Sequence, residues 1–230
     1  MLTKTSFRGA FWEDVMFKDR FDAGRRLATA LEKVRLPDPI VYALPRGGVP
    51  TAAASARMLR VPLHLLFVRK VGAPFEPELA LGAVIDAIPP KIERNEEIIA
   101  AAHVTAEEFQ RLVALEIDGI ARRRRRYALA PPPRAEGRTA LVIDDGVATG
   151  ASARVALAFL REQGARRIVF AAPVGSPEAI AELSLVADEV VCLLQPNEFC
   201  SVGAIYEDFT QVSDAEMKAV IEDCARAASR

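Results

Sequence analysis

The chain has 230 residues, about half of them apolar, and its 30 basic and 31 acidic residues leave a net charge of −1. This length suits one large α/β domain, and the balanced charge gives no reason to expect a polyanionic partner. Three cysteines without a Cys-x-x-Cys pair argue against a disulfide framework or a zinc site and predict a reducing cytoplasm. The N-terminal residues include acidic side chains and no long apolar stretch, so we expect neither a signal peptide nor a membrane span.

The first predicted element is an amphipathic helix within residues 11–35. Asp19 or Asp22 could cap its N-terminus. Its apolar side chains recur at helical spacing and are expected to face the core, whereas its arginines are expected to form a solvated face. The core-facing side chains are Phe21, Leu27, Ala28 and Leu31.

A strand at 40–44 leads into a glycine-rich loop, and a helix follows at 51–59. Gly47 and Gly48 permit positive φ and a close approach of the backbone to a ligand, and Arg46 can bind two phosphate oxygens at once. A plain strand–helix turn with two glycines is the alternative. Strand, loop and helix start together favour an anion site.

The next strand is predicted at 61–68, and Arg69 and Lys70 follow its end. Ligands of doubly wound sheets gather at the carboxyl ends of the strands, so these two cations are expected on the binding rim, with simple surface charge as the alternative. Residues 71–80 contain glycine and proline without a regular period and are expected to form a mobile loop.

Residues 86–137 are expected to form a helical insertion. Residues 91–102 could be a short strand or a helix, and a capping-box pattern at Thr105 opens a long helix that ends near Tyr127. This helix carries five consecutive arginines, Arg122–Arg126. A solvated helix end paired with nearby acids is favoured over a nucleic-acid patch, because the net charge is near zero and no aromatic platform accompanies the run.

The central stretch is 139–152, where a buried-type apolar strand runs directly into Asp144 and Asp145. Unpaired carboxylates are costly to bury, so these two should face solvent, a cation or the hydroxyls of a ligand. The loop and helix start that follow can aim backbone N–H groups at an anion. The residues of this loop are Gly146, Val147, Ala148, Thr149, Gly150, Ala151 and Ser152. Carboxylates and amides side by side predict a phosphorylated sugar as the ligand.

Helices and strands continue to alternate after this stretch, with a helix at 152–163, a strand at 167–174, a helix at 177–185 and a strand at 189–194. This alternation predicts an α/β fold: a doubly wound, mostly parallel sheet with helices on both faces. The tail at 195–212 contains Phe199, Tyr206 and Phe209, whose rings could either pack against the sheet or stack on a planar base.

The order Asp-Asp-x-x-x-Thr-Gly-x-Ser after four apolar residues, at Asp144 to Ser152, resembles the signature of type I phosphoribosyltransferases. The leader Asp-Arg-x-Asp-Ala-Gly and the tail Phe-x-x-Val-Gly-x-x-Tyr-x-x-Phe resemble a group of predicted bacterial members, so the resemblance spans essentially the whole chain. It implies phosphoribosyl transfer from 5-phosphoribosyl-1-pyrophosphate (PRPP) to a nitrogenous acceptor such as a nucleobase, with Mg²⁺ as cofactor and pyrophosphate as product.

The resemblance also implies roles for residues of this chain. The 146–152 loop would hold the 5′-phosphate, and Asp144 and Asp145 would be catalytic and hold the ribose hydroxyls or Mg²⁺. The pyrophosphate would be held by Arg46, Gly47, Gly48, Arg69 and the catalytic Lys70, and the acceptor by Phe199 and Tyr206. In the family, the 45–48 loop often contains a non-proline cis peptide, here expected at Pro45-Arg46 or Arg46-Gly47.

Two departures from the family pattern stand out. Gly146 replaces a branched apolar residue, which predicts a looser loop entry, and the interior of the 71–80 flap contains no lysine or arginine. The second departure and the Arg122–Arg126 run keep a PRPP- or nucleotide-sensing regulator open as an alternative. A hydrolase or phosphorylase acting on a related phosphoribosyl compound is a third possibility. The expected organisation is a single domain over 1–230 with a core at about 36–195 and a hood from about 1–20 and 195–212. Many members of the family are homodimers; the sequence leaves the oligomeric state open.

Overall fold

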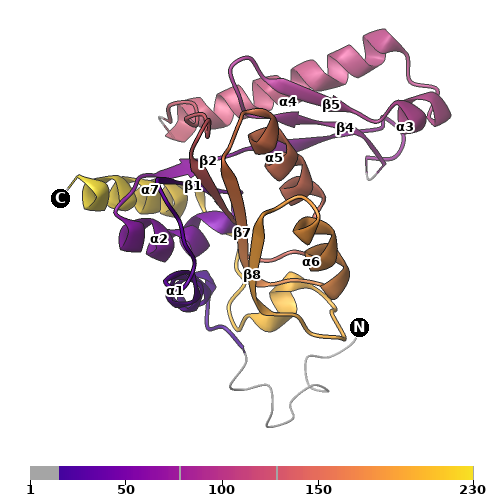
Figure 1. Cartoon of the computed structure of the whole chain (residues 1–230). Coiled ribbons are helices and arrows are strands. Elements are labelled where there is room, and N and C mark those ends of the chain that lie inside the picture. The colour runs from indigo at the N-terminus through magenta and orange to yellow at the C-terminus, as the bar shows by residue number, and fades with distance from the viewer. Residues whose placement is uncertain (1–15, 78, 128, 230) are drawn as a thin grey trace.

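The computed structural model of the chain describes residues 16–77, 79–127 and 129–229 (Figure 1). A five-stranded sheet with the strand order β2-β1-β6-β7-β8 forms its centre, and every neighbouring pair of strands is parallel. The five strands are β1 (Pro39–Ala43), β2 (Leu63–Leu65), β6 (Thr139–Ile143), β7 (Arg167–Val174) and β8 (Glu189–Leu194). The predicted doubly wound, mostly parallel sheet is therefore confirmed.

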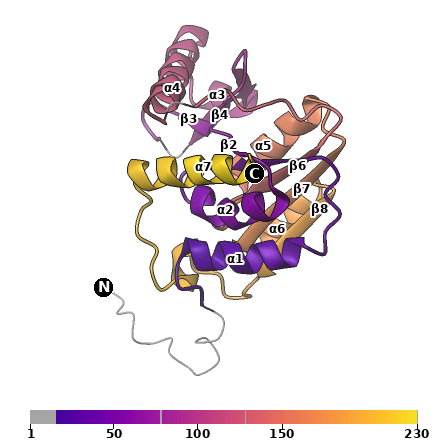
Figure 2. The ribbon, with the colours of Figure 1, turned by 90° about the vertical axis from the view of Figure 1, so that its left-hand side faces the viewer.

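Helices cover both faces of this sheet (Figures 1 and 2). One face carries α1 (Arg20–Leu31), α2 (Gly48–Leu59) and α7 (Asp214–Ala228), and the other carries α5 (Ala151–Glu162) and α6 (Pro177–Ser184). Alternate residues of a strand point to opposite faces. In β1, Val41 belongs to the core under α1 and α2, while Tyr42 belongs to the core under α5. Both side chains are fully buried, which explains the unbroken apolar pattern of these strands.

A second, antiparallel sheet with the order β3-β4-β5 stands beside the core at one end of the molecule (Figure 1). Its elements are β3 (Val68–Gly72), β4 (Ala80–Ile85) and β5 (Lys91–Arg94), and the helices α3 (Glu96–Ala101) and α4 (Ala106–Tyr127) follow. Residues 91–102, for which a short strand or a helix was expected, contain both β5 and α3, and the expected long helix is α4. Because β5 pairs with β4, which begins at Ala80, the antiparallel sheet and its two helices form a unit that begins before residue 86.

The predicted strand at 61–68 is divided between the two sheets. Its first part is β2, which ends at Leu65, and its last residue begins β3 of the antiparallel sheet. Arg69 and Lys70 therefore lie within β3 and not beyond the end of a core strand, which corrects their predicted placement. The predicted 71–80 flap falls at the turn of the β3–β4 hairpin, because its first two residues end β3 and Ala80 begins β4. Of its described residues, Ala73 donates its N–H to the Leu79 carbonyl at 2.9 Å.

The expected core-facing stripe of α1 is confirmed for Leu27, Ala28 and Leu31, but it is wrong for Phe21, which is 38% exposed. The predicted helix caps are confirmed. The Asp19 side chain caps α1 by accepting the Asp22 N–H at 2.7 Å, and Thr105 and Glu108 form the reciprocal bonds of a capping box. No helix within the described residues is long and apolar enough to cross a membrane.

The two segments that were expected to form a hood, 1–20 and 195–212, meet where the structure describes them. Phe17 and Tyr206 form a parallel bridge, with a hydrogen bond of 3.0 Å from the Phe17 N–H to the Ile205 carbonyl. A short 3₁₀ helix, η1 (Val202–Ile205), precedes the bridge in the tail. The remainder of the N-terminal part of the hood, residues 1–15, lies outside the described residues.

Candidate functional site

The acid pair lies directly after β6. The Asp144 N–H bonds to the Ala171 carbonyl of β7 at 3.2 Å, and the Asp144 carboxylate in turn accepts the Asp145 N–H at 2.8 Å. Burial and the neighbouring Asp145 carboxylate raise the pKa of Asp144 well above its ordinary value. The site therefore holds a carboxylate whose charged form would be favoured by a cation or by hydroxyl donors.

The loop after the acid pair is held at its base and open at its tip. The Val147 N–H bonds to the Val174 carbonyl at 2.9 Å, whereas Ala148, Thr149 and Ser152 are exposed. Gly150 is the N-cap of α5 with φ +69°, and no side chain caps the helix there. The N-terminal amides of this 12-residue helix are thus available to an anion, as the sequence predicts.

The second glycine loop packs directly onto the acid pair. A Cβ on Gly47 would overlap the Asp145 carboxylate, and a Cβ on Gly48 would lie 2.6 Å from the Ile143 carbonyl oxygen. Glycine is therefore needed at both positions for a close approach. The Pro45-Arg46 peptide is cis, one of the two placements that the family resemblance implies.

Arg46 extends from this loop to the start of α7. Its guanidinium pairs with the Asp214 carboxylate at 3.1 Å and donates to the Val212 carbonyl at 3.2 Å. The same carboxylate accepts the Tyr127 hydroxyl and Arg126, each at 2.6 Å. Asp214 thus connects the loop to the end of α4, a contact that spacing in the sequence does not reveal.

Arg20 is the functional residue that the sequence reasoning missed. It was expected on a solvated face of the first helix, but it is only 9% exposed and its Nε donates to Asp145 Oδ2 at 2.6 Å. A second nitrogen donates to the Thr210 carbonyl at 2.8 Å, and the guanidinium lies 3.8 Å from the centroid of the Phe209 ring. The signal in the sequence was the place of Arg20 in the leader Asp-Arg-x-Asp-Ala-Gly, directly after the capping aspartate.

The tail closes around Asp145 as well. The Tyr206 hydroxyl donates to the Asp145 carbonyl at 2.5 Å, and its ring packs between Phe17 and Phe209 with centroids 5.4 and 5.0 Å away. Tyr206 is 4% exposed, so its ring has no open face for a base, and the packing alternative holds for this residue. Phe199 is partly buried against the same cluster.

Lys70 reaches the phosphate loop from the antiparallel sheet, whereas its neighbour Arg69 does not. Lys70 and Ser152 line one cavity of about 310 Å³ between β3–β5 and the start of α5. The structure therefore brings this predicted cation to the predicted phosphate loop, although through a different element. Arg69 instead donates to Glu116 of α4 at 2.9 Å.

Gly146 explains one departure from the family pattern. A Cβ at this position would overlap the Val202 side chain and lie 3.0 Å from Val174. The loop entry is thus filled by Val202 of the tail, which corrects the expectation of a looser entry.

This contact carries a stability prediction. Gly146→Val should lower the free energy of unfolding by about 1–3 kcal/mol, because the added side chain overpacks the site. The double variant Gly146→Val with Val202→Ala should recover most of the loss, as measured by urea unfolding. Equal destabilisation of the single and double variants would show that Val202 is not the obstacle.

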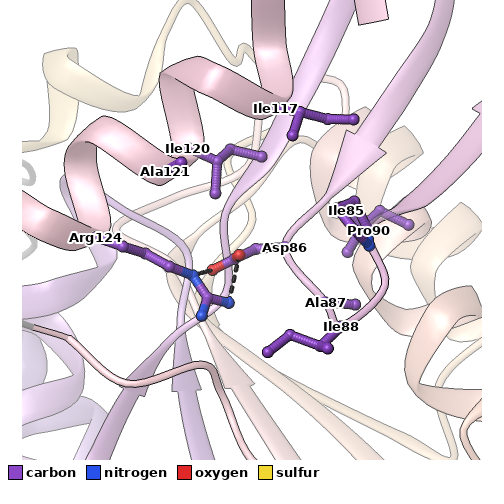
Figure 3. A pocket seen from close by; sticks show the side chains of 9 residues that line it. All are labelled: Ile85, Asp86, Ala87, Ile88, Pro90, Ile117, Ile120, Ala121 and Arg124. Atoms are coloured by element: carbon purple, nitrogen blue, oxygen red, sulfur yellow. Dashed lines mark hydrogen bonds and ion pairs between the residues drawn. The ribbon is translucent and has the colours of Figure 1, made fainter. Parts of the chain in front are cut away.

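A separate cavity of about 220 Å³ lies between the antiparallel sheet and α4 (Figure 3). None of the predicted site residues lines it. Arg124 crosses this cavity to the buried Asp86, with Nε 2.9 Å from Oδ2 (Figure 3). Burial raises the pKa of Asp86, and the Arg124 contact opposes that rise. The expectation of a solvated arginine run is therefore wrong for Arg124.

The carboxylates of the site suit Mg²⁺ only together with a substrate. Among the residues that the structure describes, no group of three or more His, Cys, Asp or Glu side chains could hold a metal ion. Mg²⁺ is often held by one or two carboxylates together with substrate phosphates and water. Asp144 and Asp145 fit that mode, although Arg20 already neutralises Asp145.

Comparison with known proteins gives this site its class. The family model of the phosphoribosyl transferase domain matches residues 18–204, which include both glycine loops, the acid pair and Arg20. The chain belongs to this family.

Individual relatives agree. Two Mycobacterium tuberculosis proteins, named "Putative phosphoribosyl transferase Rv0571c" and "Putative phosphoribosyl transferase MT0597", are each 40% identical over 92% of this chain. The chain spans about half the length of these curated relatives, 47% in each case. The crystal structure of TT1426 from Thermus thermophilus has a TM-score of 0.78 at 41% identity, covering 91% of this chain and 99% of TT1426.

Proposed function

We propose that this phosphoribosyltransferase-family chain transfers the phosphoribosyl group of PRPP to a nitrogenous acceptor and releases pyrophosphate. A nucleobase is the acceptor class that we would test first. The observation that supports this most is the contact of the 45–48 loop with Asp145, because it joins a phosphate loop, an acid pair and a second anion loop in one site.

The proposed roles follow from this adjacency. The open amides of the 146–152 loop would hold the 5′-phosphate, and Asp144 would accept hydrogen bonds from the ribose hydroxyls. Arg46, Gly47, Gly48 and Lys70 would hold the pyrophosphate group. The bond from the sugar C1 to pyrophosphate would break and a bond from C1 to the acceptor nitrogen would form, with inversion at C1.

The chain's own residues would contribute mainly position and charge. The carboxylates would lie where positive charge develops on the sugar, and the cations where negative charge develops on the leaving group, so both would favour the transition state. Asp144 and Asp145 would hold Mg²⁺ together with the substrate, and the ion would supply charge neutralisation at the pyrophosphate. Arg20 and Tyr206 would position Asp145. Arg69, held by Glu116, would lie on the pyrophosphate side of the site, and Phe199, in the tail, would contact substrate only from the edge of the site.

The direct test is a screen for PRPP consumption across free bases, aromatic acids and amines, with release of pyrophosphate as the readout. Release that requires one acceptor class supports transfer and identifies the acceptor. Release with water alone would instead support the hydrolase alternative. We also propose a cytoplasmic setting for the chain. Whether it forms a homodimer is a separate question, which sedimentation would answer.

Lys70→Ala is expected to lower kcat/KM for PRPP by about ten- to a hundredfold, the loss expected for one charge-assisted contact with the pyrophosphate. Lys33→Ala removes an equal charge from an exposed position in the turn after α1 and serves as the control. Equal kcat/KM in the two variants would remove Lys70 from the proposed site.

A PRPP- or nucleotide-sensing regulator is the second candidate. The ion pair of Arg20 with Asp145 favours it, because one of the two carboxylates is already occupied by a cation. Tight binding of Mg·PRPP without pyrophosphate release for any acceptor in the screen would support the regulator over the enzyme.

A further inference from the structure

Four residues of α4, spaced three or four positions apart, lie on the helix face that packs against the rest of the molecule. Ile120 and Tyr127 are buried on this face, and Glu116 and Arg123 are half-buried on it. Residues three, four and seven apart share one side of a helix. The arginine run is therefore not a uniform solvated end, because Arg123 lies in line with core residues.

Other arginines gather where this face meets the site. Glu116 accepts from Arg69 of β3 at 2.9 Å, and Asp214 pairs with both Arg46 and Arg126. With Arg123, the cluster contains four guanidinium groups and only two carboxylates, those of Glu116 and Asp214. The cluster therefore carries excess positive charge next to the 45–48 loop.

Arg123 is the member of this cluster without a counter-ion. Among the described residues, its guanidinium makes no ion pair or hydrogen bond, although the side chain is half-buried. Burial lowers the pKa of Arg123, and the positive charges of Arg69 and Arg46 lower it further, against smaller opposing effects of Tyr127 and Glu116. A half-buried cation among cations is unfavourable unless an anion joins it.

We propose that Arg123, together with Arg46 and Arg69, forms a binding site for a pyrophosphate group. This inference rests on the proposed function, since the site would hold the pyrophosphate end of PRPP and the released product. The ion pair of Arg126 with Asp214 positions Arg46 in this site. The planar guanidinium of Arg123 suits two oxygens of one phosphate.

The arginine run supplies its own controls. Arg122 and Arg125 are exposed neighbours in the same run, so Arg122→Ala and Arg125→Ala remove the same charge from the same helix. Calorimetric titration with pyrophosphate is expected to show binding about tenfold or more weaker for Arg123→Ala. Each control variant should change the dissociation constant by less than about threefold, the effect of an exposed, screened charge.

Thermal unfolding separates this role from a structural one. Removing a half-buried cation that faces other cations should leave the melting temperature unchanged or raise it, while pyrophosphate binding falls. Arg123→Lys keeps the charge without the planar fork and should recover part of the binding. A lower melting temperature together with unchanged pyrophosphate binding would overturn the proposal.

Two further outcomes would also overturn it. Equal losses in all three alanine variants would indicate a non-specific basic surface, and binding of single-stranded RNA at physiological salt that falls equally in all three would favour the nucleic-acid alternative.

Ribose 5-phosphate, titrated in parallel, reports on the 146–152 loop and separates this inference from the proposed function. If the wild-type chain binds ribose 5-phosphate and Arg123→Ala keeps full pyrophosphate affinity, this inference fails while the proposed function stands. If the wild-type chain binds neither ribose 5-phosphate nor Mg·PRPP, the proposed function fails. A selective loss of pyrophosphate binding in Arg123→Ala would then still support the anion site.

Discussion

The double variant Asp144→Asn with Asp145→Asn is expected to lose measurable calorimetric binding of Mg·PRPP. Both carboxylates lie at the end of β6 beside the phosphate loop, and amides would neither bind Mg²⁺ well nor accept hydroxyl protons as strongly. Loss of two charge-assisted contacts corresponds to about 3–6 kcal/mol, or at least about a hundredfold in affinity.

Inorganic phosphate provides the control ligand for this experiment. Its contacts would be with the backbone amides of the 146–152 loop, which the substitutions leave in place, so its affinity should stay within about threefold of wild type. Unchanged binding of Mg·PRPP by the double variant would exclude the acid pair from the site. Loss of phosphate binding as well would indicate that the loop itself had moved.

Replacement of Arg20 by methionine is expected to lower the free energy of unfolding by about 3–5 kcal/mol, because it leaves the Asp145 carboxylate partly buried without its cation. The methionine keeps much of the apolar volume against Phe209, so the loss would come chiefly from the ion pair and from the bond to Thr210. Urea unfolding of the purified chain measures the effect.

A double-mutant cycle and a matched arginine test this explanation. Adding Asp145→Asn to Arg20→Met should recover part of the lost stability, since the unpaired charge is then gone. Arg25→Met lies on the same helix but pairs with Asp22 at an exposed position, and should cost no more than about 1 kcal/mol. Similar losses for Arg20→Met and Arg25→Met would contradict the buried role of Arg20.

The parts of the site that the sequence predicts are those made by contiguous residues. The 139–152 stretch forms β6, the acid pair, the loop and the start of α5 as expected, because an apolar strand, small loop residues and a helical pattern follow one another within a few residues. The cis peptide at Pro45-Arg46 was expected from the family resemblance and could not have been inferred from propensity.

Predictions that depended on where an element ends were less successful. The strand predicted at 61–68 continues its apolar pattern through the point where the chain leaves one sheet for the other, so the pattern alone cannot mark the change. Arg69 and Lys70 consequently lie within an antiparallel strand. Lys70 still reaches the cavity at Ser152 because that second sheet stands over the start of α5.

By itself, the sequence determined the doubly wound fold, the two glycine loops and the acid pair, since periodicity and loop chemistry are properties of neighbouring residues. Only the tertiary structure decided which cations serve that site. Arg20 meets Asp145 across 125 positions of the chain, and Arg46 shares Asp214 with the end of α4. An arginine on a helix looks the same in sequence whether water or a carboxylate faces it, because its role depends on the charge that the fold brings to it.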